Sequence, residues 1–390
     1  MSADEMVAKA FGLSSFTTVG HLLHINLKDG LLQHKYEIGA ALLDKNTRAL
    51  AVVNKLNSID NTYRNFDIEI IAKRQDCSLS DEELMICEVN ENKCRYKLDF
   101  SKVYWNSRLC TEHERFIAKL NPFHDVVFDA FAGVGPFSVP AAKAKCRTYA
   151  NDLNPESVKW LKVNMERNKA RPGMYKIFNK DAKDFILHDV KYNLLDVYRE
   201  FIDEESATKP KIHVLMNLPA LAPTFLPHFI GLFGHDHNDA QKIDGKTVLE
   251  IFREQNLEHI VYCYCFLKGI YEDPKIEVKR MIEENLGREL SGNQLREIFK
   301  VRNVAPYKDM YRVEINLDEK ILFGIKDPVS IMKKGGLSTP ITNGHHKKVT
   351  IDVVGKKRLY EENLNSSNPS QEDDGNSPKR ARNASYCSII

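Results

Sequence analysis

The stretch VVFDAFAGVGPF, Val126–Phe137, decides the fold of this 390-residue chain. Its apolar run ends at Asp129, a turn with Gly133 and Gly135 follows, and a helical pattern comes next. Glycine lets backbone N–H groups approach a ligand closely, so a glycine turn after a strand is typical of a nucleotide site. The third glycine of the dinucleotide fingerprint is absent, because Ser138 stands in its place. The turn alone therefore indicates a nucleotide-type ligand and no more.

A second acidic residue extends this interpretation. The next apolar stretch, RTYANDLNP, contains Asp152 at its end, roughly 20 residues after the first strand. In a doubly wound α/β sheet, a carboxylate at this place meets the hydroxyl pair of a ribose. The pattern predicts an adenosine-containing cofactor and leaves open which one.

Composition narrows the class of protein. The chain is 43% hydrophobic and 28% charged with a formal net charge of +2, so any nucleic-acid binding must come from a local basic patch. We expect no membrane span and no signal peptide, because no long apolar run exists and MSADEMVAKAFG has no apolar core. The eight cysteines form no C-x-x-C motif, which predicts reduced thiols in an intracellular protein and no metal site. Cys263 and Cys265 alternate in VYCYCF and should face one side of a strand.

Changes of pattern predict two domains between flexible ends. Residues 1–14 look like a lead-in, and residues 15–103 alternate like the strands of a small α+β domain with one helix. In residues 104–325, strands alternate with helices, which is the signature of a mostly parallel, doubly wound sheet. Residues 326–390 are polar and aperiodic, so we expect a disordered tail.

The tail carries a basic group of ambiguous meaning. Lys379, Arg380 and Arg382 follow a Ser-Pro pair. Such a cluster is typical of nuclear import or a nucleic-acid contact, and a solvated tail explains it equally well.

Polar residues also follow the third and fourth predicted strands, at the sheet edge where ligands bind. Asp181 in NKDAKDF is placed to accept a hydrogen bond from a purine amine, or to cap the next helix, or both. Asn217 in HVLMNLP can donate and accept, so it suits recognition of a base or cofactor group, and Pro219 stiffens its turn. An ordinary strand-to-helix turn is the alternative.

A basic and aromatic segment, KVYWNSRLCTEHERF at residues 102–116, precedes the predicted sheet. Tyr104 and Trp105 come before Arg108, Glu112 and Arg115, which are spaced to share one helix face. This mixture suits phosphate contacts and stacking on an unpaired base. A surface helix with ion pairs would give the same pattern.

Together these blocks resemble the archaeal and eukaryotic tRNA (guanine-37-N1)-methyltransferase family. The likeness lies in DAFAGVGPF, ANDLNPES, MNLPALAPTFL, KVYWNSRLCTEHERF, VVNKLNSIDNTYRNF and VRNVAPYKDMYRV. The resemblance implies a class I, Rossmann-like methyltransferase fold with S-adenosylmethionine as cofactor. It further implies methyl transfer to N1 of guanosine 37, next to the anticodon of tRNA.

The resemblance also implies roles for single residues. The family's general base is a Glu eight residues after a Tyr, which here is Glu112 after Tyr104. Asn217 and Pro219 correspond to the family's Asn-Leu-Pro motif, and Arg74 is our choice for an assisting Arg of the preceding domain. The expected cofactor contacts come from the segments quoted above: His113, Phe131, Gly133, Gly135, Asp152, Leu153, Asp181, Ala182 and Asn217.

We expect a monomer that binds the anticodon stem-loop of tRNA and works in the cytosol, nucleus or mitochondrial matrix. Family members usually carry a further N-terminal module, which we expect to be absent or trimmed here.

Three alternatives stay open: a wybutosine-pathway tRNA aminocarboxypropyl transferase, a non-catalytic RNA-binding protein on the same fold, and a nicotinamide-dependent oxidoreductase. The first departs from the Asn-Leu-Pro motif, and the last is disfavoured by the incomplete glycine pattern.

Overall fold

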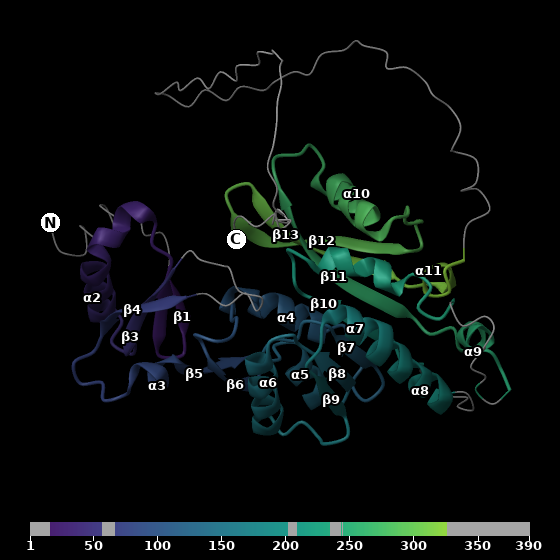
Figure 1. Cartoon of the computed structure of the whole chain (residues 1–390), viewed down its shortest axis with the longest axis horizontal. Helices are drawn as coiled ribbons and strands as arrows, with labels where there is room; N and C mark the ends of the chain where they lie inside the picture. Colours follow the sequence, from purple (N-terminus) through teal and green to yellow (C-terminus); the bar gives the residue numbers. More distant parts are fainter. Residues whose placement is uncertain (1–15, 57–66, 202–208, 235–242, 244, 326–390) are drawn as a thin grey trace, which may run out of the picture. The chain divides into compact units, whose positions relative to one another are not determined.

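A seven-stranded sheet organises the chain, in the strand order β12-β13-β11-β10-β7-β8-β9 (Figure 1). The computed structural model describes residues 16–56, 67–201, 209–234, 243 and 245–325, so the expected lead-in and tail lie outside the described residues. The strands are β7 (Val126–Asp129), β8 (Arg147–Asn151), β9 (Tyr175–Phe178), β10 (Ile212–Met216), β11 (His259–Lys268), β12 (Leu295–Ala305) and β13 (Lys308–Asn316).

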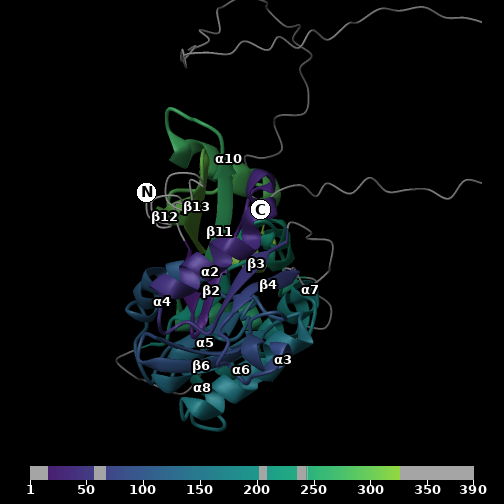
Figure 2. The same ribbon diagram turned by 90° about the vertical axis from the view of Figure 1, so that its left-hand side faces the viewer.

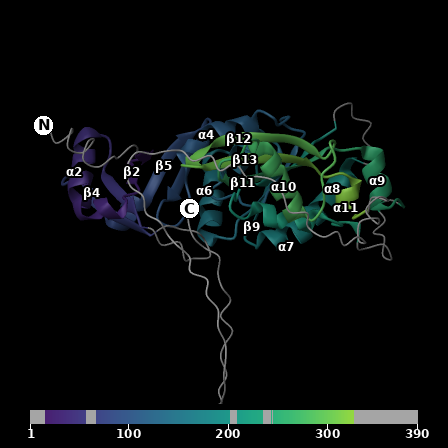
Figure 3. The ribbon, with the colours of Figure 1, turned by 90° about the horizontal axis from the view of Figure 1, so that it is seen from above.

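The five strands from β9 to β11 are parallel, and β13 and β12 complete the sheet in antiparallel pairing. Figure 3 shows β11, β12 and β13 side by side, with helix α10 (Pro274–Leu286) packed against β11 and β12. The predicted mostly parallel, Rossmann-like sheet is confirmed. The chain builds β7, β8 and β9 outward and then returns to place β10 on the other side of β7. Strand order therefore reverses between β7 and β10, which is where open α/β sheets bind ligands.

Helices cover both faces of this sheet (Figure 1). They are α4 (Cys110–Ile117), α5 (Ser138–Lys143), α6 (Pro155–Arg167), α7 (Ala182–Asp184), the π-helical η3 (Phe185–Val190), α8 (Lys191–Phe201), the 3-10 helix η4 (Ala222–Phe229), α9 (Val248–Gln255), α10 and α11 (Glu319–Leu322). None of the helices within the described ranges is long and apolar enough to cross a membrane.

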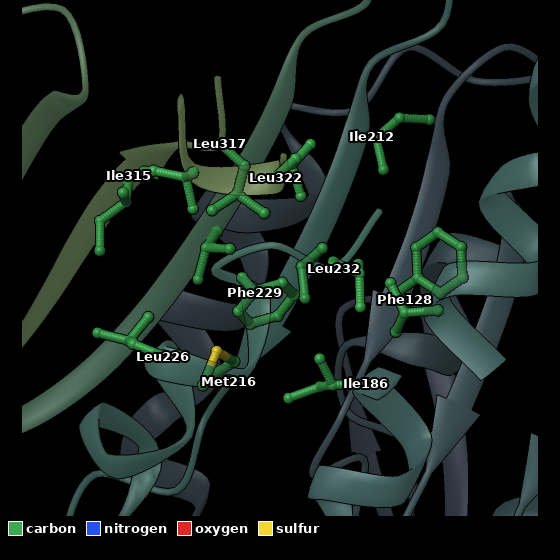
Figure 4. Packing of buried hydrophobic residues seen from close by; sticks show 14 of the residues in the cluster. Phe128, Ile186, Ile212, Met216, Leu226, Phe229, Leu232, Ile315, Leu317 and Leu322 are labelled. Atoms are coloured by element: carbon green, nitrogen blue, oxygen red, sulfur yellow. The ribbon is translucent and has the colours of Figure 1, made fainter. Parts of the chain in front are cut away.

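The two faces of the sheet bury different clusters. Figure 4 shows one face, where Phe128, Ile212 and Met216 of the strands pack with Ile186 and Phe229 of the helices. The side chains of Cys263 and Cys265 belong to this cluster, while Tyr262 and Tyr264 pack in the opposite one under α4. The prediction that the two cysteines share one face of a strand is confirmed.

A smaller mixed sheet lies at the N-terminal side of the sequence. It contains β1 (Thr17–Val19), β2 (Leu22–Ile25), β3 (Ala51–Lys55) and β4 (Ile68–Lys73), in that order. The 3-10 helix η1 (Asp29–His34) leads into α2 (Lys35–Lys45), which packs across β3 and β4 (Figure 2). This is the small α+β arrangement expected from the alternating pattern.

A two-stranded hairpin connects the two sheets along the chain. It consists of β5 (Ile86–Glu91) and β6 (Cys94–Asp99), preceded by α3 (Asp81–Met85). The backbone N–H of Arg95 donates to the Asn168 side chain at 2.8 Å, and that of Lys97 donates to Asn164 at 2.7 Å. The sequence pattern assigns this hairpin to the N-terminal domain, residues 15–103. In the structure its backbone is hydrogen-bonded to α6, a helix that covers the larger sheet.

Candidate active site

The glycine turn after β7 uses its two glycines for different purposes. Both have positive φ, +55° at Gly133 and +98° at Gly135. A Cβ at Gly133 would meet nothing within 4 Å, so this backbone is open to a ligand. A Cβ at Gly135 would lie 2.5 Å from Leu161 Cδ1 and 2.6 Å from Val139 Cγ2. Gly135 is therefore required for close packing of α5 and α6, and its expected contact with a cofactor stays a prediction.

Asp129 anchors the start of the turn. Its carboxylate is fully buried, accepts a hydrogen bond from Ser138 Oγ at 2.6 Å and receives the Phe131 N–H at 3.4 Å. Burial raises the pKa of Asp129 to about 7, although these hydrogen bonds favour the ionised form. The ring of Phe131, an expected cofactor contact, packs edge-on against Phe225 at 5.4 Å between ring centroids.

Asp152, directly after β8, reaches the same turn. Its Oδ2 accepts the Gly133 N–H at 2.7 Å, and its Oδ1 accepts the Asn154 N–H at 2.9 Å. Burial raises the pKa of Asp152 against the effect of these two bonds. The next residue, Leu153, leaves 41% of its surface exposed. The structure thus brings together the two segments that the sequence assigns to a nucleoside ligand.

Asp181 follows β9 at the same edge of the sheet. Its Oδ1 accepts the Lys183 N–H at 2.8 Å and so caps α7, which confirms the capping interpretation. The carboxylate is exposed, and its role toward a purine amine stays a prediction. Ala182 is buried in the same hydrophobic cluster as Phe128 and Met216, so its side chain serves the core and only its backbone is suited to a ligand contact.

Asn217 leaves the carboxyl end of β10, beside the switch point. Within the described residues its side-chain amide has no hydrogen-bond partner, so donor and acceptor are both available. The carbonyl of Leu218 accepts the N–H groups of Leu221 at 2.8 Å and Ala222 at 2.7 Å, which closes the turn around Pro219. Because Met216 pairs with Cys263, Asn217 lies level with Tyr264 of β11.

Glu112 lies in α4, and its side chain is buried, with only 2% of its surface exposed. Its Oε1 accepts a hydrogen bond from the Tyr264 hydroxyl at 2.9 Å and one from Arg312 of β13. Its Oε2 accepts from Arg115 at 3.1 Å, the i,i+3 partner on its own helix. The sequence indicated Arg115 but missed Tyr264 and Arg312, because only the strand register brings them to α4. An arginine at an inward position of the apolar strand YRVEINL is the one signal that marks Arg312.

His113 and Tyr104, also predicted for the site, have different surroundings. His113 is buried, its Nδ1 lies 2.5 Å from Glu91 Oε1, and its ring meets Phe137 edge-on at 4.6 Å. Its side chain therefore ties the β5–β6 hairpin to the glycine turn. Tyr104 is 53% exposed, and its hydroxyl accepts from the Asn106 amide at 3.1 Å. Trp105, the other aromatic candidate for covering a base, is a core residue against Tyr96, so that alternative is wrong.

Arg74, the expected assisting arginine, makes its hydrogen bonds to backbone groups in and after α2. Its guanidinium donates to the backbone carbonyls of Leu43, Asn46 and Ala49 at 2.7, 3.1 and 2.6 Å. These bonds hold the last turn of α2 and the loop that follows it. The geometry gives Arg74 a structural role, and its assisting catalytic role stays a prediction.

Comparisons with known proteins identify the family. The sequence model of the TRM5/TYW2 methyltransferase domain matches residues 87–208, and that of the TYW2 N-terminal domain matches residues 8–73. The tRNA (guanine(37)-N(1))-methyltransferase of Drosophila melanogaster is 44% identical over 323 residues, which is 83% of this chain and 65% of the relative. The chain belongs to the TRM5/TYW2 methyltransferase family. The resemblance stated from the sequence motifs is confirmed.

A further relative and a solved structure are also similar to this chain. The protein of the same name from Homo sapiens is 41% identical over 310 residues, covering 80% of this chain and 54% of its own. The crystal structure of Trm5b from Pyrococcus abyssi matches with a TM-score of 0.55 and 25% identity, over 80% of this chain and 77% of that one. The chain spans about half to two thirds of the length of the curated relatives it matches, from 50% to 66%.

The groups at this edge fit the nucleoside cofactor of a class I methyltransferase. The Asp152 carboxylate suits a ribose diol, and the exposed Asp181 carboxylate suits an amine donor. The open backbone at Gly133 allows a ligand to approach, and Leu153 offers an apolar surface. No group of three or more His, Cys, Asp or Glu side chains suited to a metal ion occurs among the described residues.

Proposed function

We propose that this protein transfers a methyl group from S-adenosylmethionine to N1 of guanosine 37 in tRNA. The observation that carries the proposal is the hydrogen bond between the buried Glu112 and Tyr264 of β11. Asn217 follows the last paired residue of the neighbouring β10, and the Asp152-bound glycine turn follows β7. A carboxylate, an amide and a nucleoside site together supply what proton removal and methyl transfer at a ring nitrogen require. The curated relatives that carry this activity in their name support it.

S-adenosylmethionine supplies a methyl group on a sulfonium that is a good leaving group. In this proposal Asp152 accepts from the ribose hydroxyls, Asp181 accepts from the adenine amine, and Leu153 contacts the adenine ring. Gly133 contributes its open backbone. These residues belong to one rigid edge of the sheet, and holding the donor in line with the acceptor nitrogen accounts for most of the rate.

N1 of guanine carries a proton and is a poor nucleophile while it keeps that proton. Glu112 takes the proton as the new N–C bond forms, and the amide of Asn217 stabilises negative charge on O6. Pro219 and the hydrogen-bonded Leu218 carbonyl fix the turn that presents Asn217. The exposed ring of Tyr104 is suited to cover a base that has left the anticodon-loop stack.

The proposed partner is therefore tRNA, bound through its anticodon stem-loop by a monomer. The seven described cysteines are free thiols, which suits a reducing compartment such as cytosol, nucleus or mitochondrial matrix.

A second function has one observation in its favour. The match of residues 8–73 to the TYW2 N-terminal domain supports aminocarboxypropyl transfer from the same cofactor. The Asn-Leu-Pro turn at Asn217 and the curated relatives favour methyl transfer.

Mapping the modified nucleotide tests the proposal. The purified chain is incubated with S-adenosylmethionine and a tRNA transcript that has guanosine 37, and nuclease fragments are weighed by mass spectrometry. We expect the mass of one methyl group on guanosine 37 and no modification of a matched transcript with adenosine 37. An added aminocarboxypropyl group would establish the second function, and an unmodified tRNA would contradict both.

Cofactor binding can be tested apart from tRNA. Replacing Asp152 with Asn keeps the side-chain volume and removes the charge that accepts from the ribose. Because a hydrogen bond to a charged group contributes about 1.5–3 kcal/mol, we expect at least about tenfold weaker cofactor binding by calorimetry. Asp184→Asn, at an exposed acid of α7, is the matched control and should bind like the wild type. Equal affinity in both variants would exclude the ribose role of Asp152.

A further inference from the structure

The buried Arg312 contacts Glu112, the proposed general base. Arg312 lies in the middle of β13, directly opposite Tyr264 of β11, and is 2% exposed. Burial of a guanidinium is expensive unless carboxylates compensate it. Three do so here: one amino group of Arg312 contacts Glu112, and the other contacts Glu297 at 2.7 Å and Glu314 at 3.0 Å.

The surrounding charges keep Arg312 ionised and fixed. Burial alone would lower the pKa of Arg312, but the charges of Glu112 and Tyr264 and the hydrogen bonds to Glu112 and Glu297 raise it above its usual value. Lys119, in the turn after α4, completes the group by an ion pair with Glu314 at 2.8 Å. The guanidinium also stacks on the ring of Phe299, 4.9 Å from its centre.

The two oxygens of Glu112 have unequal partners. Oε1 is held by Tyr264 and Arg312, and both of these side chains are buried. Oε2 has one partner among the described residues, Arg115, whose side chain is 43% exposed. The exposed Arg115 also lies over the Phe299 ring, 4.9 Å from its centre. The neighbouring His113 faces Glu91 and takes no part in this arrangement.

We propose that Arg312 is the positioning residue for Glu112: with Tyr264 it fixes Oε1, and it leaves Oε2 as the atom that takes the proton from N1 of the substrate base. The inference rests on the proposed function. A positive charge within contact distance favours an ionised carboxylate in surroundings that would otherwise neutralise it. The groups that face Glu112 are Arg115 of α4, Tyr264 of β11 and Arg312 of β13, with Lys119, Glu297 and Glu314 around Arg312.

The test is the pH dependence of single-turnover methyl transfer with saturating S-adenosylmethionine. In Arg312→Gln we expect the acidic limb of the rate to move about one to three pH units upward, because the carboxylate loses its main counter-charge. Arg312→Lys restores a positive charge and should keep the limb close to that of the wild type. Arg296→Gln, which breaks an exposed pair between β12 and Glu258, is the matched control and should change neither rate nor limb.

Arg312→Gln leaves three acids without their cation and is the variant most at risk of failing to fold. Tyr264→Phe then carries the test, because it removes one donor to Oε1 and leaves every charge in place. We expect a slower rate and a smaller upward shift of the limb, with cofactor affinity unchanged.

The inference is overturned if the folded variants are slower while their acidic limb stays at the wild-type pH, since that pattern describes a purely structural role. It is equally overturned if Tyr264→Phe and a folded Arg312→Gln both match the wild type in rate and limb. Failure of the proposed function looks different, because the wild type itself would then leave guanosine 37 unmethylated.

Discussion

Asp129 illustrates how a single residue links the site to stability. Its carboxyl group is completely buried at the start of the glycine turn, and its pKa is raised from 3.8 to about 7. A raised pKa means that the folded state favours the protonated carboxyl group over the ionised one. The stabilisation that protonated Asp129 provides is fully present below about pH 4 and is lost as the pH rises through about 7.

Replacing Asp129 with Asn should therefore flatten the pH dependence of stability. A pKa raised from 3.8 to about 7 corresponds to a loss of folding stability on the order of 4 kcal/mol between acidic and neutral pH. Urea unfolding at pH 5 and pH 8 measures this: the wild type should lose stability between the two conditions, and Asp129→Asn should lose much less. If both proteins lost the same stability between pH 5 and pH 8, Asp129 would be excluded as the source of this pH dependence.

At the residue scale, the sequence predicted the groups that follow strands better than those that meet across them. Asp152 and Gly133 are close because both follow neighbouring parallel strands, and that placement follows from the pattern alone. Arg312 and Tyr264 meet Glu112 through strand pairing at the antiparallel edge, for which the sequence has no short-range signal. The structural contacts of Arg74 were not predicted, because an arginine that binds backbone carbonyls has no distinguishing local motif.

At the scale of elements, helix α6 joins the β5–β6 hairpin to the glycine turn through Asn164. This buried side chain accepts from the Lys97 N–H at 2.7 Å and donates to the Val134 carbonyl, between the two glycines, at 3.0 Å. Its amide thus serves two backbone groups, one in β6 and one in the glycine turn. Removing it leaves both unsatisfied.

We expect Asn164→Ala to reduce the free energy of unfolding by about 2–4 kcal/mol and to weaken cofactor binding, because the turn loses a fixed point. Thermal denaturation and calorimetry measure the two effects. Asn285→Ala, which removes a single bond to the Met281 carbonyl within α10, should cost less and leave cofactor binding intact. If both variants behaved alike, α6 would not support the turn in this way.

Elements were predicted where the hydrophobic period is clear and missed where it is not. The strands β7 to β11 and helix α6 follow from alternation and from the Asn154–Pro155 start, where Asn154 accepts the Glu156 N–H at 3.0 Å. Helix α8 (Lys191–Phe201) was not singled out from the sequence, because its apolar face packs on the core while its other face is charged.

For the whole molecule, a net charge of +2 cannot attract an anionic partner from a distance. Any tRNA affinity must come from local cations, and neutralised phosphates release counterions. We expect tRNA binding to weaken at least about tenfold between 50 and 200 mM salt, while S-adenosylmethionine binding changes little. Filter binding and calorimetry over this range measure both. A salt-independent tRNA affinity would mean that the contacts are not to phosphates.

The overall topology was predictable from the alternation of strands and helices, which fixes a parallel sheet and its ligand edge. The antiparallel edge of β12 and β13 was not, because period-two patterns do not distinguish parallel from antiparallel pairing. That edge supplies Arg312, so the part of the site missed by the sequence is the part built on non-local pairing.

The central claim is that Glu112 removes the proton from N1 of guanosine 37, and Glu112→Gln tests it most directly. Glutamine keeps the shape of the side chain and its contact with Tyr264 but cannot act as a base. Under single turnover with saturating S-adenosylmethionine and tRNA, we predict a fall in rate of about 10²–10⁴-fold with unchanged cofactor affinity. A rate near that of the wild type would contradict the claim.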